Sequence, residues 1–260
     1  MHWSEVWEDA NPGAQVARLA LTPLSWVYAL GWEAYLGLYK IGFKRAAEPH
    51  QPVLCIGNLR VGGSGKTPVC IHMLDVLDHL GRNAVLSCSG YGSPASEAAR
   101  LAPTGPLRAS EWGDEPALVR WLRPDVPIVV GRRRVLAAEL VHAQFPDRVM
   151  LMDDGFQHLP LRKHVTILLD PPSPNWRCLP AGPYREPKRH GRRADLVIPN
   201  GFCIHEQVQV VDQDRVEMAP GERINALCAI GAPYRFYESL RRLGWSVDDT
   251  RSLPDHAPLD

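Results

Sequence analysis

The chain reads Val61-Gly62-Gly63-Ser64-Gly65-Lys66-Thr67 between an apolar run over 53–56 and a helix-like run over 69–80. A strand, a glycine-rich turn and a helix in this order are typical of a P-loop, where backbone N–H groups and the positive end of the helix dipole surround a phosphate. Lys66 supplies a cation for the terminal phosphates, and the Thr67 hydroxyl is a ligand for Mg²⁺. The strict motif has Gly where this chain has Arg60, so the alternative is a glycine-rich turn with a solvated lysine. We predict a phosphate-binding loop formed by Gly62, Gly63, Ser64, Gly65, Lys66 and Thr67.

Strand-like and helix-like runs alternate after residue 52, which predicts an α/β fold with a parallel sheet and flanking helices. The strand candidates are 53–56, 84–87, 128–130, 149–152, 165–169, 196–198 and 224–230, and the helix candidates are 69–80, 115–122, 133–144 and 234–243. A proline-rich patch over 171–187 marks a domain junction or a site loop. We predict an N-terminal segment over 1–48, a P-loop nucleotide-binding domain over 49–164 and a second, smaller α/β domain over 165–260.

Composition excludes several classes of function. The 260 residues hold 29 Lys and Arg against 29 Asp and Glu, so the net charge is zero and no nucleic-acid partner is expected. The six cysteines are scattered without a C-x-x-C pair or a zinc-type histidine spacing, which fits reduced thiols in the cytosol. The first residues lack the basic segment of a cleavable signal peptide.

The N-terminal segment is rich in aromatic and apolar residues. Residues 19–32 carry no charge, and six Trp, Tyr and Phe side chains lie within 16–43. Pro23, Glu33 and Lys40 interrupt this run, which is too short to cross a bilayer. Aromatic side chains and flanking cations favour an anionic lipid surface. We predict a helix in the membrane interface, and the alternative is a buried helix packed on the domain.

A pair of carboxylates follows the apolar run 149–152. In P-loop enzymes an acid at the carboxyl end of a neighbouring strand holds Mg²⁺ opposite the Ser or Thr of the loop. We therefore predict a magnesium site formed by Thr67, Asp153 and Asp154.

Asp114 lies in Trp112-Gly113-Asp114-Glu115-Pro116, between two strand–helix units. Loops at this position of a doubly wound sheet converge on the ligand site, where a carboxylate can accept the proton of an attacking hydroxyl. The equally weighted alternative is that Asp114 caps the helix that begins beside it.

Two basic clusters stand out in a chain without net charge. One runs over 185–193 after a turn-rich stretch, and the other is Gly131-Arg132-Arg133-Arg134 at the end of a strand. A solvated charge run is the default interpretation. Arginine forks next to backbone amides also suit an anionic substrate, so Arg132 and Arg185 are candidate substrate ligands.

Taken together, these segments resemble the tetraacyldisaccharide 4′-kinase family, the lipid A kinases of Gram-negative bacteria. The resemblance covers nearly the whole chain and includes the aromatic N-terminal helix. The matching motifs are 57–58, 61–68, 90–92, 113–116, 130–132, Asp153-Asp154-Gly155-Phe156-Gln157-His158, 179–187, 193–195 and 254–256.

The resemblance implies a P-loop kinase that uses ATP and Mg²⁺ to phosphorylate the 4′-hydroxyl of an acylated glucosamine disaccharide 1-phosphate, a lipid A precursor, at the cytoplasmic face of the inner membrane. By motif position, Lys66 and Thr67 hold ATP and Mg²⁺, and the two carboxylates of the Asp-Asp motif serve the metal. The resemblance further implies that Asp114 is the catalytic base, that His256 supports it, and that Arg185 and Glu186 line the site.

The chain departs from the family pattern at two places. The family motif S-R-G-Y-G reads Cys88-Ser89-Gly90-Tyr91-Gly92, so Ser89 replaces an arginine. Family members also continue past the Asp255-His256 motif through a T-T-E-K-D stretch, so we expect an incomplete second domain. Two other functions stay open: a P-loop NTPase that does not phosphorylate lipid, and a non-catalytic lipid-binding relative.

Overall fold

The computed structural model describes residues 6–7, 11–62, 64–199, 218, 221, 223–230 and 233–253. The chain forms two compact units, Met1–Phe202 and Cys203–Asp260.

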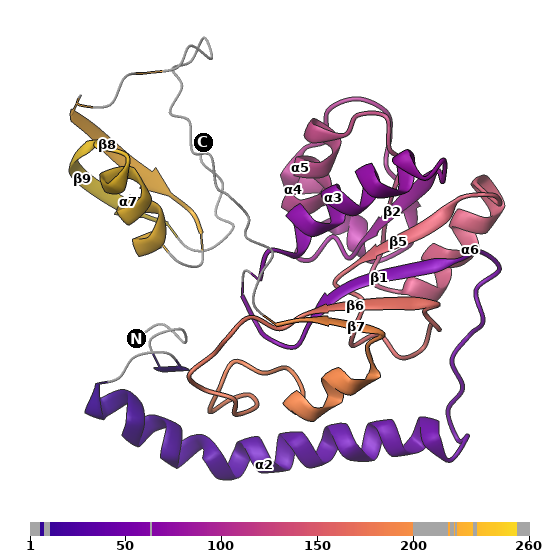
Figure 1. The fold of residues 1–260 in the computed structure, drawn as a ribbon, viewed down its shortest axis with the longest axis horizontal. Helices are drawn as coiled ribbons and strands as arrows, with labels where there is room; N and C mark the ends of the chain where they lie inside the picture. Colours follow the sequence, from indigo (N-terminus) through magenta and orange to yellow (C-terminus); the bar gives the residue numbers. More distant parts are fainter. Residues whose placement is uncertain are drawn as a thin grey trace. The chain divides into compact units, whose positions relative to one another are not determined.

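The first unit is built on a seven-stranded sheet of order β3-β4-β2-β5-β1-β6-β7 (Figure 1). All neighbouring strands run parallel except the edge pair β3 and β4. This arrangement confirms the predicted α/β class. The strands are β1 (Val53–Asn58), β2 (Ala84–Cys88), β3 (Arg100–Leu101), β4 (Ile128–Val130), β5 (Val149–Asp153), β6 (Val165–Leu169) and β7 (Leu196–Ile198).

Helices cover both faces of this sheet because its central strands are apolar on both sides. One face, which includes Ile56, Leu86 and Leu151, packs on helices α3 and α5. The opposite face, which includes Cys55 and Met150, packs on α6. The helices are α3 (Lys66–His79), α4 (Ala109–Trp112), α5 (Asp114–Leu122) and α6 (Arg134–Gln144), and two short 3-10 helices are η1 (Pro94–Ser96) and η2 (Lys188–Arg193).

The N-terminal segment forms one long helix, α2 (Pro12–Lys40). Asn11 caps it by accepting a 2.7 Å hydrogen bond from the Ala14 amide. Tyr28 and Ala29 pack on a third apolar cluster under β6. The opposite side of the helix is apolar and between 57% and 70% exposed at Val16, Leu19, Leu24, Trp26, Val27 and Leu30. Helix α2 therefore packs on the domain, as the alternative expects, but only along one side, and the contact of its exposed side with lipid stays a prediction.

Length and apolarity together decide whether a helix can span a membrane. Within the described ranges, none of the helices has enough of both to cross one.

The second unit contains a strand–helix–strand motif in its described residues. Strands β8 (Arg223–Cys228) and β9 (Ser246–Ser252) run parallel and are joined by helix α7 (Pro233–Arg242). The expected strand over 224–230 and helix over 234–243 are thus confirmed. Its core consists of Ala226, Cys228, Tyr237, Leu240 and Trp245.

The predicted boundary after residue 164 differs from the structure. Strand β6 pairs with β1, and β7 pairs with β6, so both belong to the first sheet. The proline-rich patch is a long excursion between these two strands, and the first unit continues to Phe202. The run of prolines marks an irregular segment, but it does not show to which sheet the chain returns.

Candidate active site

The P-loop and the Asp-Asp motif meet at one edge of the sheet. Strands β1 and β5 are parallel neighbours, and Ile56 is paired with Asp153 near their carboxyl ends. Ligands of open α/β sheets bind at this edge, beyond the carboxyl ends of the strands. The two motifs, which are separated by about a third of the chain, therefore face one site.

The glycine-rich loop has the backbone shape that a phosphate site needs. Gly62 and Gly65 have φ angles of 102° and 75°, in the left-handed region that side chains disfavour. Ser64 is held by a 2.7 Å hydrogen bond from Asn58 Nδ2 to its Oγ. Gly65 precedes α3, and no side chain of the described residues caps this helix. Its first N–H groups are left for a ligand. Gly63 lies outside the described residues.

Asp153 is a fully buried carboxylate that is short of positive partners. Burial, followed by the negative charge of Glu115, raises the pKa of Asp153 to about 7. Thr67 Oγ1 donates to Asp153 Oδ2 at 3.5 Å, whereas Oδ1 is buried without a hydrogen-bond partner among the described residues.

A divalent cation fits between these two side chains. A P-loop needs only one carboxylate and one hydroxyl for Mg²⁺, because phosphate oxygens and water complete the shell. In the part of the chain that the structure describes, no three His, Cys, Asp or Glu side chains gather as a metal cluster.

Asp154 has different surroundings from its neighbour. Its carboxylate accepts hydrogen bonds of 3.0 and 2.8 Å from Arg185 Nη1, and Lys66 Nζ lies 3.8 Å away. Its φ of 52° turns the chain sharply after the strand. The sequence predicts both carboxylates as magnesium ligands. The unsatisfied oxygen belongs to Asp153, whereas Asp154 is paired with Lys66 and Arg185, and its contact with the metal stays a prediction.

Asp114 is the first residue of α5 and is exposed at the carboxyl edge of the sheet. The cap of this helix is Gly113, with φ of 94° and no side-chain cap bond. The alternative that Asp114 caps the helix therefore does not fit. A side chain at Gly113 would lie 3.3 Å from the Gly90 Cα, so the 90–92 loop borders this site. The catalytic role of Asp114 stays a prediction, and His256 lies outside the described residues.

The cluster Gly131-Arg132-Arg133-Arg134 contains two different kinds of arginine. Arg132 is exposed, and its role as a substrate ligand stays a prediction. Arg134 is buried and donates to Ser87 Oγ at 3.0 Å and to the Asp153 carbonyl at 2.6 Å. Sequence reasoning did not single out Arg134, which fixes the end of β5 from the first turn of α6.

Glu186 lies beneath the site instead of lining an open surface. It is fully buried, and its Oε2 accepts hydrogen bonds from His190 Nδ1 at 2.9 Å and from Arg193. Its Oε1 accepts a 3.1 Å bond from Gln157 Nε2. These bonds hold the loop that carries Arg185, and direct contact of Glu186 with a substrate stays a prediction.

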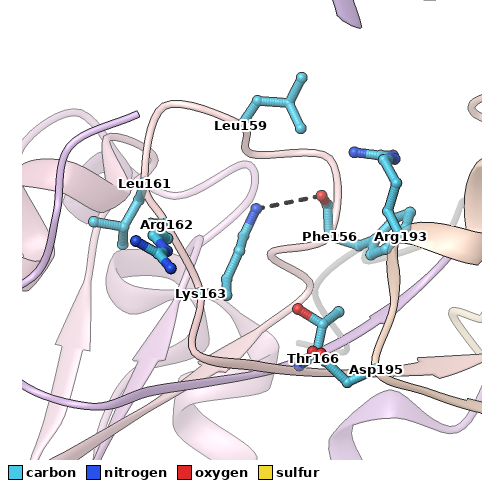
Figure 2. Close-up of a pocket in the computed structure, with 8 residues that line it drawn as sticks. All are labelled: Phe156, Leu159, Leu161, Arg162, Lys163, Thr166, Arg193 and Asp195. Carbon is cyan, nitrogen blue, oxygen red and sulfur yellow. Dashed lines mark hydrogen bonds between the residues drawn. The ribbon is translucent and has the colours of Figure 1, made fainter. Parts of the chain in front are cut away.

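A pocket of about 270 Å³ lies under the loop that follows the Asp-Asp motif (Figure 2). Lys163 Nζ donates to the His158 carbonyl at 2.6 Å and to the Phe156 carbonyl at 3.4 Å. Burial lowers the pKa of Lys163 to about 8. The pocket contains none of the predicted P-loop residues; it is lined by Phe156, Leu159, Leu161, Arg162, Lys163, Thr166, Arg193 and Asp195.

Comparison with known proteins identifies the family. A family model described as tetraacyldisaccharide-1-P 4′-kinase matches residues 17–260. The chain belongs to this family. The resemblance inferred from the motifs is thereby confirmed.

Relatives and one solved structure agree with this family assignment. The tetraacyldisaccharide 4′-kinase of Shewanella halifaxensis is 32% identical over 98% of this chain and 80% of the relative. The Shewanella baltica (strain OS195) protein of the same name is 32% identical over 99% of this chain and 79% of its own length. The crystal structure of LpxK from Aquifex aeolicus in complex with ATP has a TM-score of 0.77 and 29% identity, over 93% of this chain and 83% of that one.

Proposed function

We propose that this chain is a lipid kinase that transfers the terminal phosphoryl group of ATP to the 4′-hydroxyl of a tetraacyldisaccharide 1-phosphate, a lipid A precursor. The family assignment and the ATP complex of the Aquifex aeolicus structure support this proposal. The observation that carries it is the meeting of the glycine-rich loop with Asp153 at the ends of two neighbouring strands.

The nucleotide site consists of the loop 62–67. The loop amides and the start of α3 bind the phosphates, and Lys66, held toward the site by Asp154, neutralises the terminal ones. Thr67 and Asp153 would hold Mg²⁺, which would supply positive charge to the phosphates of the nucleotide. Arg134 keeps Asp153 in place through its backbone carbonyl.

The acceptor site adjoins the nucleotide site, because Arg185 and Lys66 both contact Asp154. Arg132 and Arg185 suit anionic groups of the lipid, and Asp114 accepts the proton of the attacking hydroxyl while His256 supports it. Removing a general base lowers turnover by about 10²–10⁴-fold, so Asp114→Asn loses that much with little change in ATP affinity. His256→Ala loses less. If the residues act as a pair, the double variant is hardly slower than Asp114→Asn, whereas losses that multiply contradict the pairing.

We further propose that the exposed apolar side of α2 lies in the membrane interface, at the cytoplasmic face of the inner membrane. Trp26 is 70% exposed beside other large apolar side chains, and Lys40, Lys44 and Arg45 follow at the end of the helix. Aromatic side chains favour the headgroup region, and the cations favour anionic lipid.

Nucleotide turnover distinguishes the kinase from the two other functions. ATP consumption by the lipid kinase depends on the disaccharide acceptor, and it is lost in Lys66→Ala. Turnover that is unchanged without acceptor favours an NTPase. Failure to bind ATP, measured by calorimetry, favours a non-catalytic lipid-binding relative.

A further inference from the structure

The polar residues of α2 are bonded to the segment that carries Arg185 and Glu186. Tyr28 donates from its hydroxyl to the Arg185 carbonyl at 2.7 Å. Ser25 donates to the Cys178 carbonyl at 2.8 Å. The 3-10 helix η2, drawn in orange, lies between α2 and β7 (Figure 1). Helix α2, which has the exposed apolar side, therefore also packs against the segment that carries Arg185 and Glu186.

A buried histidine joins two carboxylates at this contact. His190 Nε2 lies 2.6 Å from Glu33 Oε1 of α2, and His190 Nδ1 lies 2.9 Å from Glu186 Oε2. Each ring nitrogen of His190 is therefore within hydrogen-bond distance of one carboxylate, so the imidazole links α2 to the segment that carries Glu186. The hydrogen bond from His190 lowers the pKa of Glu33.

Two arginines complete the charge balance around His190. Arg189 donates to Glu33 Oε1 at 2.5 Å, and Arg193 donates to Glu186 Oε2. The carboxylates Glu33 and Glu186 are thus each shared between the imidazole of His190 and one arginine. Glu186 is fully buried, whereas Glu33 and Arg189 are 36% and 63% exposed, so water can replace a lost partner at the Glu33 end of the network.

The network continues from Glu186 to the phosphate-binding loop. Gln157 Nε2 donates both to Glu186 Oε1 at 3.1 Å and to the Asn58 carbonyl at 2.8 Å. Asn58 Nδ2 in turn donates to Ser64 Oγ at 2.7 Å. An unbroken series of polar contacts therefore runs from α2 to the P-loop.

We infer that Glu33 and His190 are positioning residues for the phosphate-binding loop, which they hold through Glu186, Gln157 and Asn58. Helix α2 is then part of the active-site scaffold in addition to its proposed contact with lipid. The kinase readout of this inference rests on the proposed function, whereas its ATP-binding readout does not.

The test compares Glu33→Gln with Glu48→Gln in detergent micelles that carry the acceptor. Glu48 is a matched control, because it forms a surface pair with Arg162 at 2.8 Å and both side chains are exposed. Displacement of catalytic groups by about 1 Å costs about 10²-fold in rate, so a smaller shift in Glu33→Gln lowers kcat about tenfold. The Kd of Glu33→Gln for ATP, measured by calorimetry, rises several-fold. Its melting temperature equals that of Glu48→Gln.

A second variant distinguishes positioning from simple destabilisation. In a His190→Gln background, Glu33→Gln has no further effect on kcat or on ATP affinity, because the link is already broken. Three results would overturn the inference. The losses in kcat of the two single variants could multiply in the double variant, or the loss could follow a fall in melting temperature. Glu33→Gln could also have the same kcat and ATP affinity as Glu48→Gln. If the parent chain transfers no phosphoryl group to lipid, the proposed function fails, and the ATP dissociation constants alone decide on the positioning role.

Discussion

Gly57→Ala tests how closely β1 approaches the loop that follows the Asp-Asp motif. A Cβ at Gly57 would lie 2.5 Å from Phe156 Cβ and 3.2 Å from Phe156 N, whereas ordinary contacts begin at 3.4 Å. Phe156 must therefore move by about 0.9 Å, the difference between 2.5 and 3.4 Å. Overpacking of this kind costs about 1–3 kcal/mol, and at about 2–4 °C per kcal/mol the melting temperature falls by about 2–12 °C.

The same displacement reaches the carboxylates of the Asp-Asp motif, because Phe156 follows Asp153 by three residues. A 1 Å shift of catalytic groups costs about 10²-fold, so we expect lipid phosphorylation to fall by that order. The assay pairs differential scanning fluorimetry with label transfer from ATP. Gly37→Ala in α2 is the control, because its Cβ meets no atom within 4 Å. The free energy of unfolding of Gly37→Ala rises by about 0.5–1 kcal/mol, because alanine loses less conformational entropy than glycine when the helix folds. Wild-type melting and turnover in Gly57→Ala would refute the close approach.

Three further changes have defined outcomes. Lys66→Ala abolishes label transfer at an unchanged melting temperature, and a folded variant that keeps most activity contradicts the P-loop assignment. The double variant Trp26→Ser, Leu30→Ser sediments less with anionic vesicles. The protein stays folded because these side chains are 70% and 68% exposed. Undiminished binding to the vesicles places the lipid contact elsewhere. Burial lowers the pKa of His158 from 6.5 to about 4, so the unfolded chain binds an extra proton between these pH values and stability is lost as pH falls through them. Denaturant titrations of His158→Gln should show a weaker loss over that range, and an identical pH dependence contradicts a buried neutral imidazole.

The parts of the site that the sequence predicted rest on local signals. The glycines before Lys66 sit between a strand and a helix that are both adjacent in the chain, and Asp153 directly follows an apolar strand. Parallel α/β topology then brings the two strand ends together without further information. The fold class was likewise predictable, because strand-like and helix-like stretches alternate along the sequence.

The remaining features depend on contacts between distant segments. Glu33 and His190 are 157 positions apart, and no spacing rule pairs them. Glu186 is likewise buried among bonds from Gln157, His190 and Arg193, which its motif does not reveal, and its direct contact with a substrate stays a prediction. The boundary after residue 164 failed because pairing of β6 with β1 is likewise a long-range choice.

The central claim is most directly tested by the chemical identity of the product. The chain is incubated with ATP labelled at its terminal phosphate and a tetraacyldisaccharide 1-phosphate in micelles, and the lipid is analysed by mass spectrometry and ³¹P NMR. We expect a lipid with a second phosphomonoester at the 4′ position, one for each ATP consumed, and no such product with Lys66→Ala. Release of labelled inorganic phosphate without a phosphorylated lipid, or label at another hydroxyl, would contradict it.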